Sequence, residues 1–562
     1  MQKIWLDSYP AGVPAEIAPP GYVNLCELLE QSCARFRART AFTNMGVALG
    51  FGDLTRLSRD FGAYLQQVVG LRPGDRLAIM LPNLLQYPVA LFGALRAGMV
   101  VVNVNPLYTA PELARQLADS GARAIVVLEN FAHTLEFALA GTAVRQVITT
   151  QPGDLFPAAR RWLVNFVVKH VKRLVPAWRI DGAVGMRAAL ARGATLALEQ
   201  AALGPEDVAL LQYTGGTTGN PKGAILTHGN MVANVEQTLA WSRTTLREGE
   251  ETVVTALPLY HVFALTANLL LFLRLGGNNL LITDPRDMPA MIADLRHTRF
   301  SAMTGVNTLY GALLDAAGFA EVAARARGSL KLAVAGGMAV QRAVSERWQQ
   351  ATGVPLVEGY GLTEAAPNVC ANPFDARTFS GKLGLPLPST EVAILDEHDA
   401  EAPLGAAGEI CVRGPQVMRG YWNRPEESAQ AFAPGGWLRT GDIGRMDEHG
   451  YLEFVDRKKD MIVVSGFKAY PTEIEDVVMR HPGVLDAAAV GVPDARSGEA
   501  VALFVTRRDP ALSAQALRAH CARFLTGYKR PVRIEFRDAL PKNPLGKILR
   551  RRLRDEAAGT DG

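Results

Sequence analysis

The sequence predicts an α/β protein with a large N-terminal domain at residues 1–456 and a small α+β domain at residues 457–562. Three observations support this fold class. Short, uniformly apolar runs alternate with helical patterns in the first part of the chain. From about residue 381 to residue 456, short strands are separated by Gly, Pro and Asp clusters. The C-terminal part then has a separate α+β pattern. A chain of 562 residues also exceeds what one hydrophobic core usually supports.

The N-terminal domain is predicted to contain two mostly parallel sheets covered by helices on both faces. Its expected strands are apolar throughout, which is typical of parallel strands that are buried on both sides. These strands are expected at residues 76–81, 124–128, 146–149, 208–213, 251–257 and 330–334.

The segment from residue 381 to residue 456 is predicted to form an antiparallel, β-barrel-like subdomain. Two of its expected strands lie at residues 391–395 and 409–413. In the C-terminal domain, we expect a helix at 471–480, strands at 486–492 and 500–506, and a basic tail.

The bulk composition is that of a folded protein of the reducing cytoplasm. Apolar residues make up 48% of the chain and charged residues 20%. A net charge of +4 is too small to indicate nucleic acid as the main partner. The five cysteines are an odd number without a CxxC pair, which argues against a disulfide framework or a zinc site. The first residues lack an apolar signal core, and no apolar stretch is long enough to span a bilayer.

The run from Tyr213 to His228, YTGGTTGNPKGAILTH, is predicted to bind phosphate. Glycines let the backbone approach an anion, threonine hydroxyls and backbone N–H groups donate hydrogen bonds, and lysine adds a positive charge. We expect a strand before this loop and a helix after it, the usual setting for phosphate binding. A flexible surface loop is the alternative. The candidate ATP-binding residues here are Thr214, Gly215, Gly216, Thr217, Thr218, Gly219 and Lys222.

Further motifs follow in a fixed order. They are LKLAVAGG at residues 330–337, VEGYGLTE at 357–364, WLRTGD at 437–442, VDRKKD at 455–460 and LPKNPLGKILR at 540–550. With these motifs, the chain resembles the adenylate-forming, acyl-activating family over essentially its whole length. Within that family, residues 83–93, 258–265 and 464–475 look most like the bacterial ligases of long-chain fatty acids and CoA.

The resemblance implies a reaction in two steps. A fatty carboxylate attacks the α-phosphate of ATP to give acyl-AMP and pyrophosphate, and the CoA thiol then attacks the acyl-adenylate and releases AMP. The expected partners are long-chain fatty acid, ATP and CoA, with Mg²⁺ as cofactor. The alternatives are a related ligase that acts on another chain length or on aromatic acids, one that delivers acyl-AMP to a carrier protein, and a catalytically silent binding protein.

The resemblance places the family's C-terminal catalytic lysine at Lys547, where the ammonium would neutralise charge between the carboxylate and the α-phosphate. A solvated lysine in a basic tail is the alternative. Glu364 resembles the magnesium ligand of the family, and Thr363 beside it resembles a donor to the α-phosphate. For these two residues the alternative is a helix N-terminal cap.

Other nucleotide contacts are implied in the same way. Tyr360 would stack on adenine, with Gly336 and Gly337 allowing close approach of the base, although core packing of the tyrosine is an alternative. Asp442 resembles the ribose ligand, and Arg457 resembles a second nucleotide contact. The aspartate could instead belong to an ordinary turn.

Three residues are assigned to the later step and to the acyl chain. Lys459 occupies the hinge position of the family, about which the small domain would rotate between the two half-reactions. Gly466 resembles the glycine that lines the CoA tunnel, with a plain turn as the alternative. His261 lies in a motif near the acyl pocket, and it could equally be a packing histidine.

A basic amphipathic helix is predicted at residues 160–178, from Arg160 to Trp178. Leu163, Phe166, Val167, Val171 and Leu174 share one face of this helix, and basic side chains gather on the other. Packing of the apolar face on the core is one interpretation. The other is peripheral contact with the anionic inner face of the cytoplasmic membrane. Pairing of two copies as a homodimer is also left open.

Overall fold

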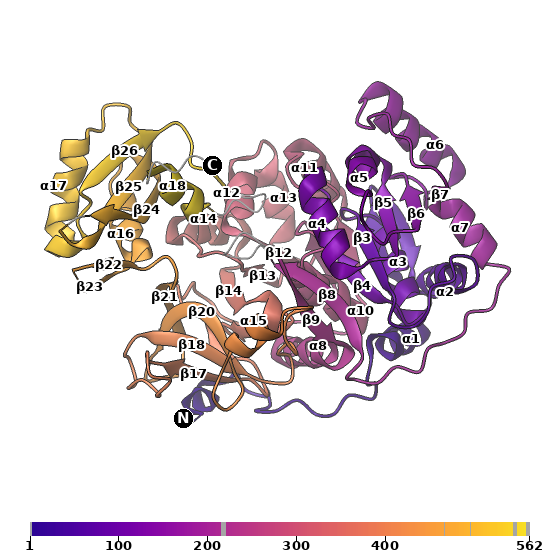
Figure 1. Ribbon diagram of the computed structural model, residues 1–562, viewed down its shortest axis with the longest axis horizontal. Coiled ribbons are helices and arrows are strands. Elements are labelled where there is room, and N and C mark those ends of the chain that lie inside the picture. Colours follow the sequence, from indigo (N-terminus) through magenta and orange to yellow (C-terminus); the bar gives the residue numbers. More distant parts are fainter. Residues whose placement is uncertain (1–2, 215–220, 466, 495, 543–547, 558–562) are drawn as a thin grey trace. The chain divides into compact units, whose positions relative to one another are not determined.

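The computed structural model describes residues 3–214, 221–465, 467–494, 496–542 and 548–557 (Figure 1). The chain divides into two compact units. The larger unit comprises residues 8–391 and 413–432, and the smaller unit comprises residues 1–7, 392–412 and 433–562. The domain boundary expected between residues 456 and 457 stays a prediction.

The larger unit contains a nine-stranded sheet with the order β16-β15-β14-β13-β12-β10-β11-β1-β2. Neighbours from β14 through β13, β12, β10 and β11 to β1 are parallel, and the remaining pairs are antiparallel. The strands are β1 (Thr40–Asn44), β2 (Val47–Gly50), β10 (Thr252–Thr255), β11 (Asn278–Leu281), β12 (Ala302–Gly305), β13 (Leu332–Ala335), β14 (Leu356–Gly361), β15 (Asn368–Ala371) and β16 (Leu385–Pro386).

A seven-stranded sheet with the order β7-β6-β5-β3-β4-β8-β9 lies in the same unit, and only its β8–β9 pair is antiparallel. All five residues of β5 are buried, as expected for an apolar parallel strand. The predicted α/β class with mostly parallel sheets is therefore confirmed. The strands are β3 (Arg76–Met80), β4 (Val100–Asn103), β5 (Ala124–Leu128), β6 (Gln146–Thr150), β7 (Val184–Gly185), β8 (Val208–Thr214) and β9 (Lys222–Thr227).

Helices and short helical turns connect these strands. Among the described helices, none is both long and apolar enough to cross a membrane. The helical elements before β10 are η1 (Ile4–Ser8), α1 (Leu25–Arg35), α2 (Phe51–Gln67), α3 (Gln86–Arg96), α4 (Ala110–Ser120), η2 (Glu129–Phe131), α5 (Ala132–Ala138), α6 (Ala158–Phe166), η3 (Val167–Val171), α7 (Met186–Gly193) and α8 (His228–Ser242). Those after β10 are α9 (Val262–Ala264), η4 (Leu265–Leu270), α10 (Leu271–Leu275), α11 (Met288–His297), α12 (Asn307–Asp315), α13 (Phe319–Ala326), α14 (Arg342–Thr352), η5 (Thr363–Ala365) and α15 (Pro425–Gln430).

Most of a five-stranded sheet belongs to the smaller unit, where a β-barrel-like subdomain was expected, and its β18–β20 and β20–β21 pairs are antiparallel. Its strands are β17 (Glu391–Leu395), β18 (Gly408–Arg413), β19 (Phe432–Ala433), β20 (Trp437–Met446) and β21 (Leu452–Arg457). The C-terminal part adds β22 (Ile462–Val464), β23 (Phe467–Ala469), β24 (Val484–Asp494), β25 (Gly498–Arg507) and β26 (Arg533–Arg537), with α16 (Pro471–Met479), α17 (Ala514–Phe524), η6 (Gly527–Lys529) and α18 (Arg550–Ala557). Apolar side chains of α16, α17, β24 and β25 form its core.

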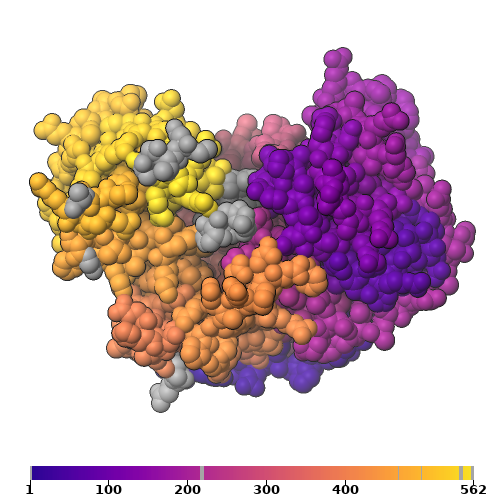
Figure 2. Space-filling model, viewed as in Figure 1, coloured from indigo at the N-terminus to yellow at the C-terminus, as the bar shows by residue number. Residues whose placement is uncertain are grey.

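The predicted amphipathic helix is shorter than expected. It consists of α6 and the π-helical segment η3 and ends at Val171, because Arg173 has a left-handed φ of 50°. Most side chains of the predicted apolar face are exposed and not packed on the core, although Val167 is half-buried. Trp162 is 66% exposed and Val171 is 64% exposed, and Leu163, Phe166 and Leu174 are exposed as well. The segment projects from the larger unit at the upper right of Figures 1 and 2.

The buried helices α2 and α3 approach each other closely at two glycines. A Cβ atom on Gly93 would lie 2.8 Å from Cδ1 of Phe61 and 2.9 Å from the main-chain oxygen of Ser58. A Cβ atom on Gly62 would lie 2.8 Å from the main-chain oxygen of Gly93. The contact between these helices therefore depends on the absence of side chains at both positions.

We expect Gly93→Ala to lower the thermal midpoint by several degrees, because overpacking of a core costs about 1–3 kcal/mol. Gly311→Ala is the matched control, since a Cβ atom at Gly311 in α12 would meet nothing within 4 Å. That control should raise the midpoint slightly, because alanine is favoured over glycine in helices by about 1 kcal/mol. Thermal scans of both variants measure the difference. Equal midpoints would contradict the close packing of α2 and α3.

Candidate active site

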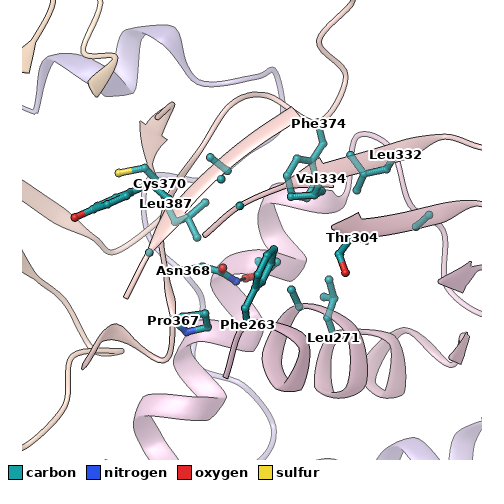
Figure 3. Close-up of a pocket in the computed structure, with 18 of the residues that line it drawn as sticks. Phe263, Leu271, Thr304, Leu332, Val334, Pro367, Asn368, Cys370, Phe374 and Leu387 are labelled. Atoms are coloured by element: carbon teal, nitrogen blue, oxygen red, sulfur yellow. Dashed lines mark hydrogen bonds between the residues drawn. The ribbon is translucent and has the colours of Figure 1, made fainter. Parts of the chain in front are cut away.

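The larger unit encloses a mainly apolar cavity with about 800 Å³ of empty space, including space open to solvent. Helical segments provide one side of the lining, with Phe263 from α9 and Leu271 from α10 (Figure 3). Strands provide another side, with Thr304 from β12 and Val334 from β13. Thr304 and Val334 are direct partners in the parallel β12–β13 ladder. An apolar ligand group is the natural occupant of such a space.

A buried polar network positions the helical wall of the cavity. Asn268 lies in the π-helical segment η4 and is fully buried. Its Oδ1 accepts a hydrogen bond from Thr304 Oγ1 at 2.9 Å, and its Nδ2 donates to Thr255 Oγ1 at 3.1 Å. These bonds join η4 to strands β12 and β10. A π-helical turn is frequently found at a functional site, and this one adjoins the cavity.

Three residues predicted to contact adenine line the same cavity: Gly336, Gly337 and Tyr360. A Cβ atom on Gly336 would lie 3.0 Å from the Phe263 ring and 3.2 Å from the main-chain oxygen of Gly359. Gly337 has a φ of 77°, which side chains rarely tolerate. The structure thus brings these residues together and gives a steric reason for both glycines.

The predicted phosphate loop connects two antiparallel strands. Thr214 ends β8, Lys222 begins β9, and the two residues are partners in the ladder. The helix expected after the loop is present as α8, but a strand that the sequence did not predict, β9, pairs with β8 before this helix begins. Gly215, Gly216, Thr217, Thr218 and Gly219 lie outside the described residues.

Glu364 and Lys222 are linked by Tyr421, a residue that the sequence motifs did not single out. The Tyr421 hydroxyl donates a hydrogen bond to Glu364 Oε1 at 2.8 Å. Lys222 Nζ lies 5.3 Å from the centroid of the Tyr421 ring, within range of a cation–π interaction. Burial and the neighbouring Glu364 carboxylate raise the pKa of the Tyr421 phenol, so it remains a donor at neutral pH. Its only sequence signal is a lone Gly-Tyr pair, which is too short to assign.

The surroundings of Glu364 fit a magnesium ion bound together with phosphate. In the described part of the chain, no group of three or more His, Cys, Asp or Glu side chains could hold a metal by itself. Mg²⁺ is usually bound by one or two carboxylates, with phosphates and water completing its shell. Glu364 supplies such a carboxylate, and Thr363 precedes it in the short helical turn η5.

His261 is the first residue before α9 and is not among the residues that line the cavity. Phe263, two residues further on, is a lining residue. Burial lowers the pKa of His261 to about 4, so the imidazole is neutral near pH 7. Its ring packs 5.3 Å from that of Tyr260. Its assignment to an acyl pocket stays a prediction.

In the smaller unit, Asp442 and Arg457 form an ion pair with 2.8 Å between Oδ1 and Nε. They are cross-strand partners in the antiparallel β20–β21 ladder, which fixes their approach. The Asp442 side chain is buried, and the Arg457 side chain is partly exposed. Two residues predicted from separate motifs to contact the nucleotide are therefore direct neighbours.

Lys459 lies in a turn after β21, where Asp460 N–H donates to the Arg457 carbonyl at 3.0 Å. Burial lowers the pKa of the Lys459 ammonium. A turn between strands is compatible with a hinge, and that role stays a prediction. Gly466 and Lys547 lie outside the described residues.

The residues on both sides of 543–547 are anchored. Lys542 pairs with Ile548 in an antiparallel bridge, and Lys542 Nζ lies 2.6 Å from Asp486 Oδ2. Arg550 Nε donates to Glu475 Oε1 at 3.0 Å. Burial raises the pKa of the Glu475 carboxyl to about 7, although the Arg550 guanidinium acts in the opposite direction. These contacts fix the chain on either side of the segment that contains the predicted catalytic lysine.

Known proteins match this chain over its full length. The family described as AMP-binding enzyme matches residues 29–422, and the AMP-binding enzyme C-terminal domain matches residues 473–547. A long-chain-fatty-acid–CoA ligase from Escherichia coli is 57% identical over 559 residues, which cover 100% of this chain and 99% of that protein. A feruloyl-CoA synthase from an Amycolatopsis species is 34% identical over 517 residues, which cover 92% of this chain and 95% of that protein.

Solved structures share the fold. ATP-bound MatB from Rhodopseudomonas palustris has a TM-score of 0.80 and 27% identity, with 95% of this chain and 99% of that chain covered. The anthranilate CoA ligase AuaEII in complex with anthranoyl-AMP has a TM-score of 0.80 and 25% identity, with 96% of this chain and 98% of that chain covered. Through these sequence and structural matches, the chain is shown to belong to the family of AMP-binding enzymes.

Proposed function

We propose that this protein uses ATP to join long-chain fatty acids to CoA through an acyl-AMP intermediate, with release of AMP and pyrophosphate. The observation that carries the proposal is a single cavity that is mainly apolar and is also lined by Gly336, Gly337 and Tyr360. An adenine ring beside these residues and an alkyl chain along the apolar lining would bring the fatty carboxylate close to the α-phosphate. The 57% identity to a long-chain-fatty-acid–CoA ligase favours the same substrate class.

Two alternatives stay within the same family. Activation of an aromatic acid has some support from the 34% identity to a feruloyl-CoA synthase, which is well below the identity to the fatty-acid ligase. Delivery of acyl-AMP to a carrier protein is the other alternative. The apolar lining of the cavity favours an alkyl chain over both, because few polar groups are available there to orient a substituted ring.

The proposed chemistry must overcome the repulsion between a carboxylate and a triphosphate. Lys222 and the loop that precedes it would bind the β- and γ-phosphates. Glu364 would hold Mg²⁺, and Thr363 would donate a hydrogen bond to the α-phosphate. Mg²⁺ supplies charge neutralisation for the phosphate oxygens when it is bound. Asp442 accepts hydrogen bonds from the ribose hydroxyls, with Arg457 fixing its carboxylate. Fixed donors and positive charges of this kind supply most of the catalysis in phosphoryl-transfer sites.

The proposal is tested by pyrophosphate release from ATP with acids of graded chain length, with and without CoA. We expect rapid release with long-chain fatty acids and formation of the thioester only when free CoA is present. Faster turnover of aromatic acids, or thioester formation on a carrier protein in preference to CoA, would favour the corresponding alternative. No release with any acid would refute the proposed function.

We predict that Lys547→Ala reduces acyl-AMP formation by about a hundredfold to a thousandfold, because a positive charge at the reacting phosphate is lost. The same variant should still convert supplied acyl-AMP and CoA to the thioester. Arg551→Ala is the matched control, since Arg551 lies in the same basic tail and its ion pair with Asp555 stays within α18. Pyrophosphate release and thioester formation, measured separately, report the two steps. Normal pyrophosphate release by Lys547→Ala would remove this residue from the mechanism.

We also propose that the segment formed by α6 and η3 contacts anionic membranes. Trp162 and Phe166 stack with ring centroids 5.2 Å apart, and both are exposed. The basic residue Lys169 in η3 is exposed, and so are Lys172 and Arg173 directly after it. Exposed aromatic side chains beside basic residues suit the headgroup region of an anionic bilayer. Such contact would give the enzyme access to fatty acid dissolved in the bilayer.

Vesicle flotation at low salt tests this contact. The wild-type protein should float with phosphatidylglycerol vesicles, and the double variant Trp162→Ser, Phe166→Ser should bind about tenfold less. Leu404→Ser is the control, because Leu404 is an exposed leucine outside this segment. High salt should weaken binding of the wild-type protein. If the wild-type protein does not float, or if the double variant floats equally well, the proposed contact is absent.

A further inference from the structure

The segment around Tyr421 lies beside the strand that follows the predicted phosphate loop. Trp422 N–H donates to the Gly223 carbonyl at 2.8 Å, and Ile225 N–H donates to the Gly420 carbonyl at 2.9 Å. Ala224 and Tyr421 form an antiparallel bridge between these two hydrogen bonds. This pairing fixes the main chain of Tyr421 against the start of β9, where Lys222 is located.

A second set of contacts, within the segment that contains Tyr421, fixes the main chain of this residue. Tyr421 N–H donates to Ser428 Oγ at 2.8 Å, and Ser428 Oγ donates to the Arg424 carbonyl at 2.6 Å. Gly420 has a φ of 145°, and a Cβ atom there would lie 2.9 Å from Ser428 Oγ. The backbone on both sides of the tyrosine is therefore constrained, and this constraint fixes the position from which the Tyr421 side chain extends.

Tyr421 acts on Glu364 through its hydroxyl and on Lys222 through its ring. The hydroxyl donates to Glu364 Oε1 at 2.8 Å, while Met418 N–H donates to the Glu364 carbonyl at 2.8 Å, so both the carboxylate and the main chain of Glu364 are restrained. The ring lies 5.3 Å from Lys222 Nζ. A hydrogen bond to an ionised carboxylate fixes its rotation without removing its charge.

These contacts reduce the flexibility of the Lys222 and Glu364 side chains. Lysine and glutamate side chains have many rotamers, and ordering them on binding costs free energy. A single phenol that contacts both groups orders the ammonium and the carboxylate before the ligand arrives. Residues that orient a metal ligand in this way commonly affect metal affinity or activity by about 10–100-fold.

We infer that Tyr421 is a positioning residue that holds the Lys222 ammonium and the Glu364 carboxylate in one arrangement for ATP and its magnesium ion. The inference rests on the proposed function. The hydroxyl orients the Glu364 carboxylate, which would hold magnesium. The ring orients the Lys222 ammonium, which would contact phosphate. The two contributions can therefore be separated by substitution.

Binding of ATP, measured by titration calorimetry with excess Mg²⁺ and again in EDTA, tests the inference without turnover. Tyr421→Phe keeps the ring and removes the hydroxyl, so ATP affinity in Mg²⁺ should fall about tenfold and affinity in EDTA should be unchanged. Tyr421→Leu removes the ring as well, so affinity in EDTA should also fall, by about threefold to tenfold. Tyr9→Phe is the control, because the Tyr9 hydroxyl donates to the Pro386 carbonyl instead.

Kinetics of the two half-reactions give an independent measurement. For Tyr421→Phe, the apparent KM for magnesium–ATP in pyrophosphate release should rise about tenfold, and conversion of supplied acyl-AMP and CoA should stay at the wild-type rate. Equal losses in both half-reactions would indicate a merely structural role and overturn the inference. Unchanged magnesium-dependent ATP affinity in Tyr421→Phe would overturn it as well.

Failure of the inference is distinguishable from failure of the proposed function. If the wild-type protein releases no pyrophosphate with any acid, the proposed function fails whatever the variants do. If the wild-type protein is active and Tyr421→Phe matches it in both measurements, only the role of Tyr421 fails.

Discussion

Parallel pairing of three neighbouring strands is the constraint on which the candidate site depends. β12, β13 and β14 run in the same direction, so their carboxyl ends meet at one edge of the nine-stranded sheet. The chain leaves β13 into Gly336 and Gly337, and it leaves β14 into Thr363 and Glu364. Residues within β12 and β13 line the apolar cavity. One sheet edge therefore places groups suited to a nucleotide beside a space suited to an alkyl chain.

The elements that the sequence predicted well are those whose signal is local. β5 was expected at residues 124–128 and has those bounds, because a strand buried on both faces is apolar at every position. The motif glycines were also identifiable, and the close contact of Gly336 with Phe263 explains why no side chain is present there. Residues 215–219 of the phosphate loop and Lys547 lie outside the described residues, so their roles stay predictions.

The features that the sequence did not predict depend on contacts between distant segments. β9 was missed because a short apolar run after a glycine loop does not distinguish a strand from the start of a helix. Tyr421 was missed because its importance comes from pairing with β9 and from its contact with Glu364. The exposure of Trp162 could not be predicted either, since an amphipathic pattern is the same whether or not the apolar face finds a partner.

The pairing of Lys542 with Ile548 has a consequence for how the chain tolerates changes in its length. The bridge fixes the two described residues that flank positions 543–547. For a flexible loop, the entropic cost of closure grows slowly with length, by about 0.6 kcal/mol for each doubling. Residues added between the two bridged positions would therefore lower the free energy of unfolding only slightly, whereas a substitution that breaks the bridge would release both flanks.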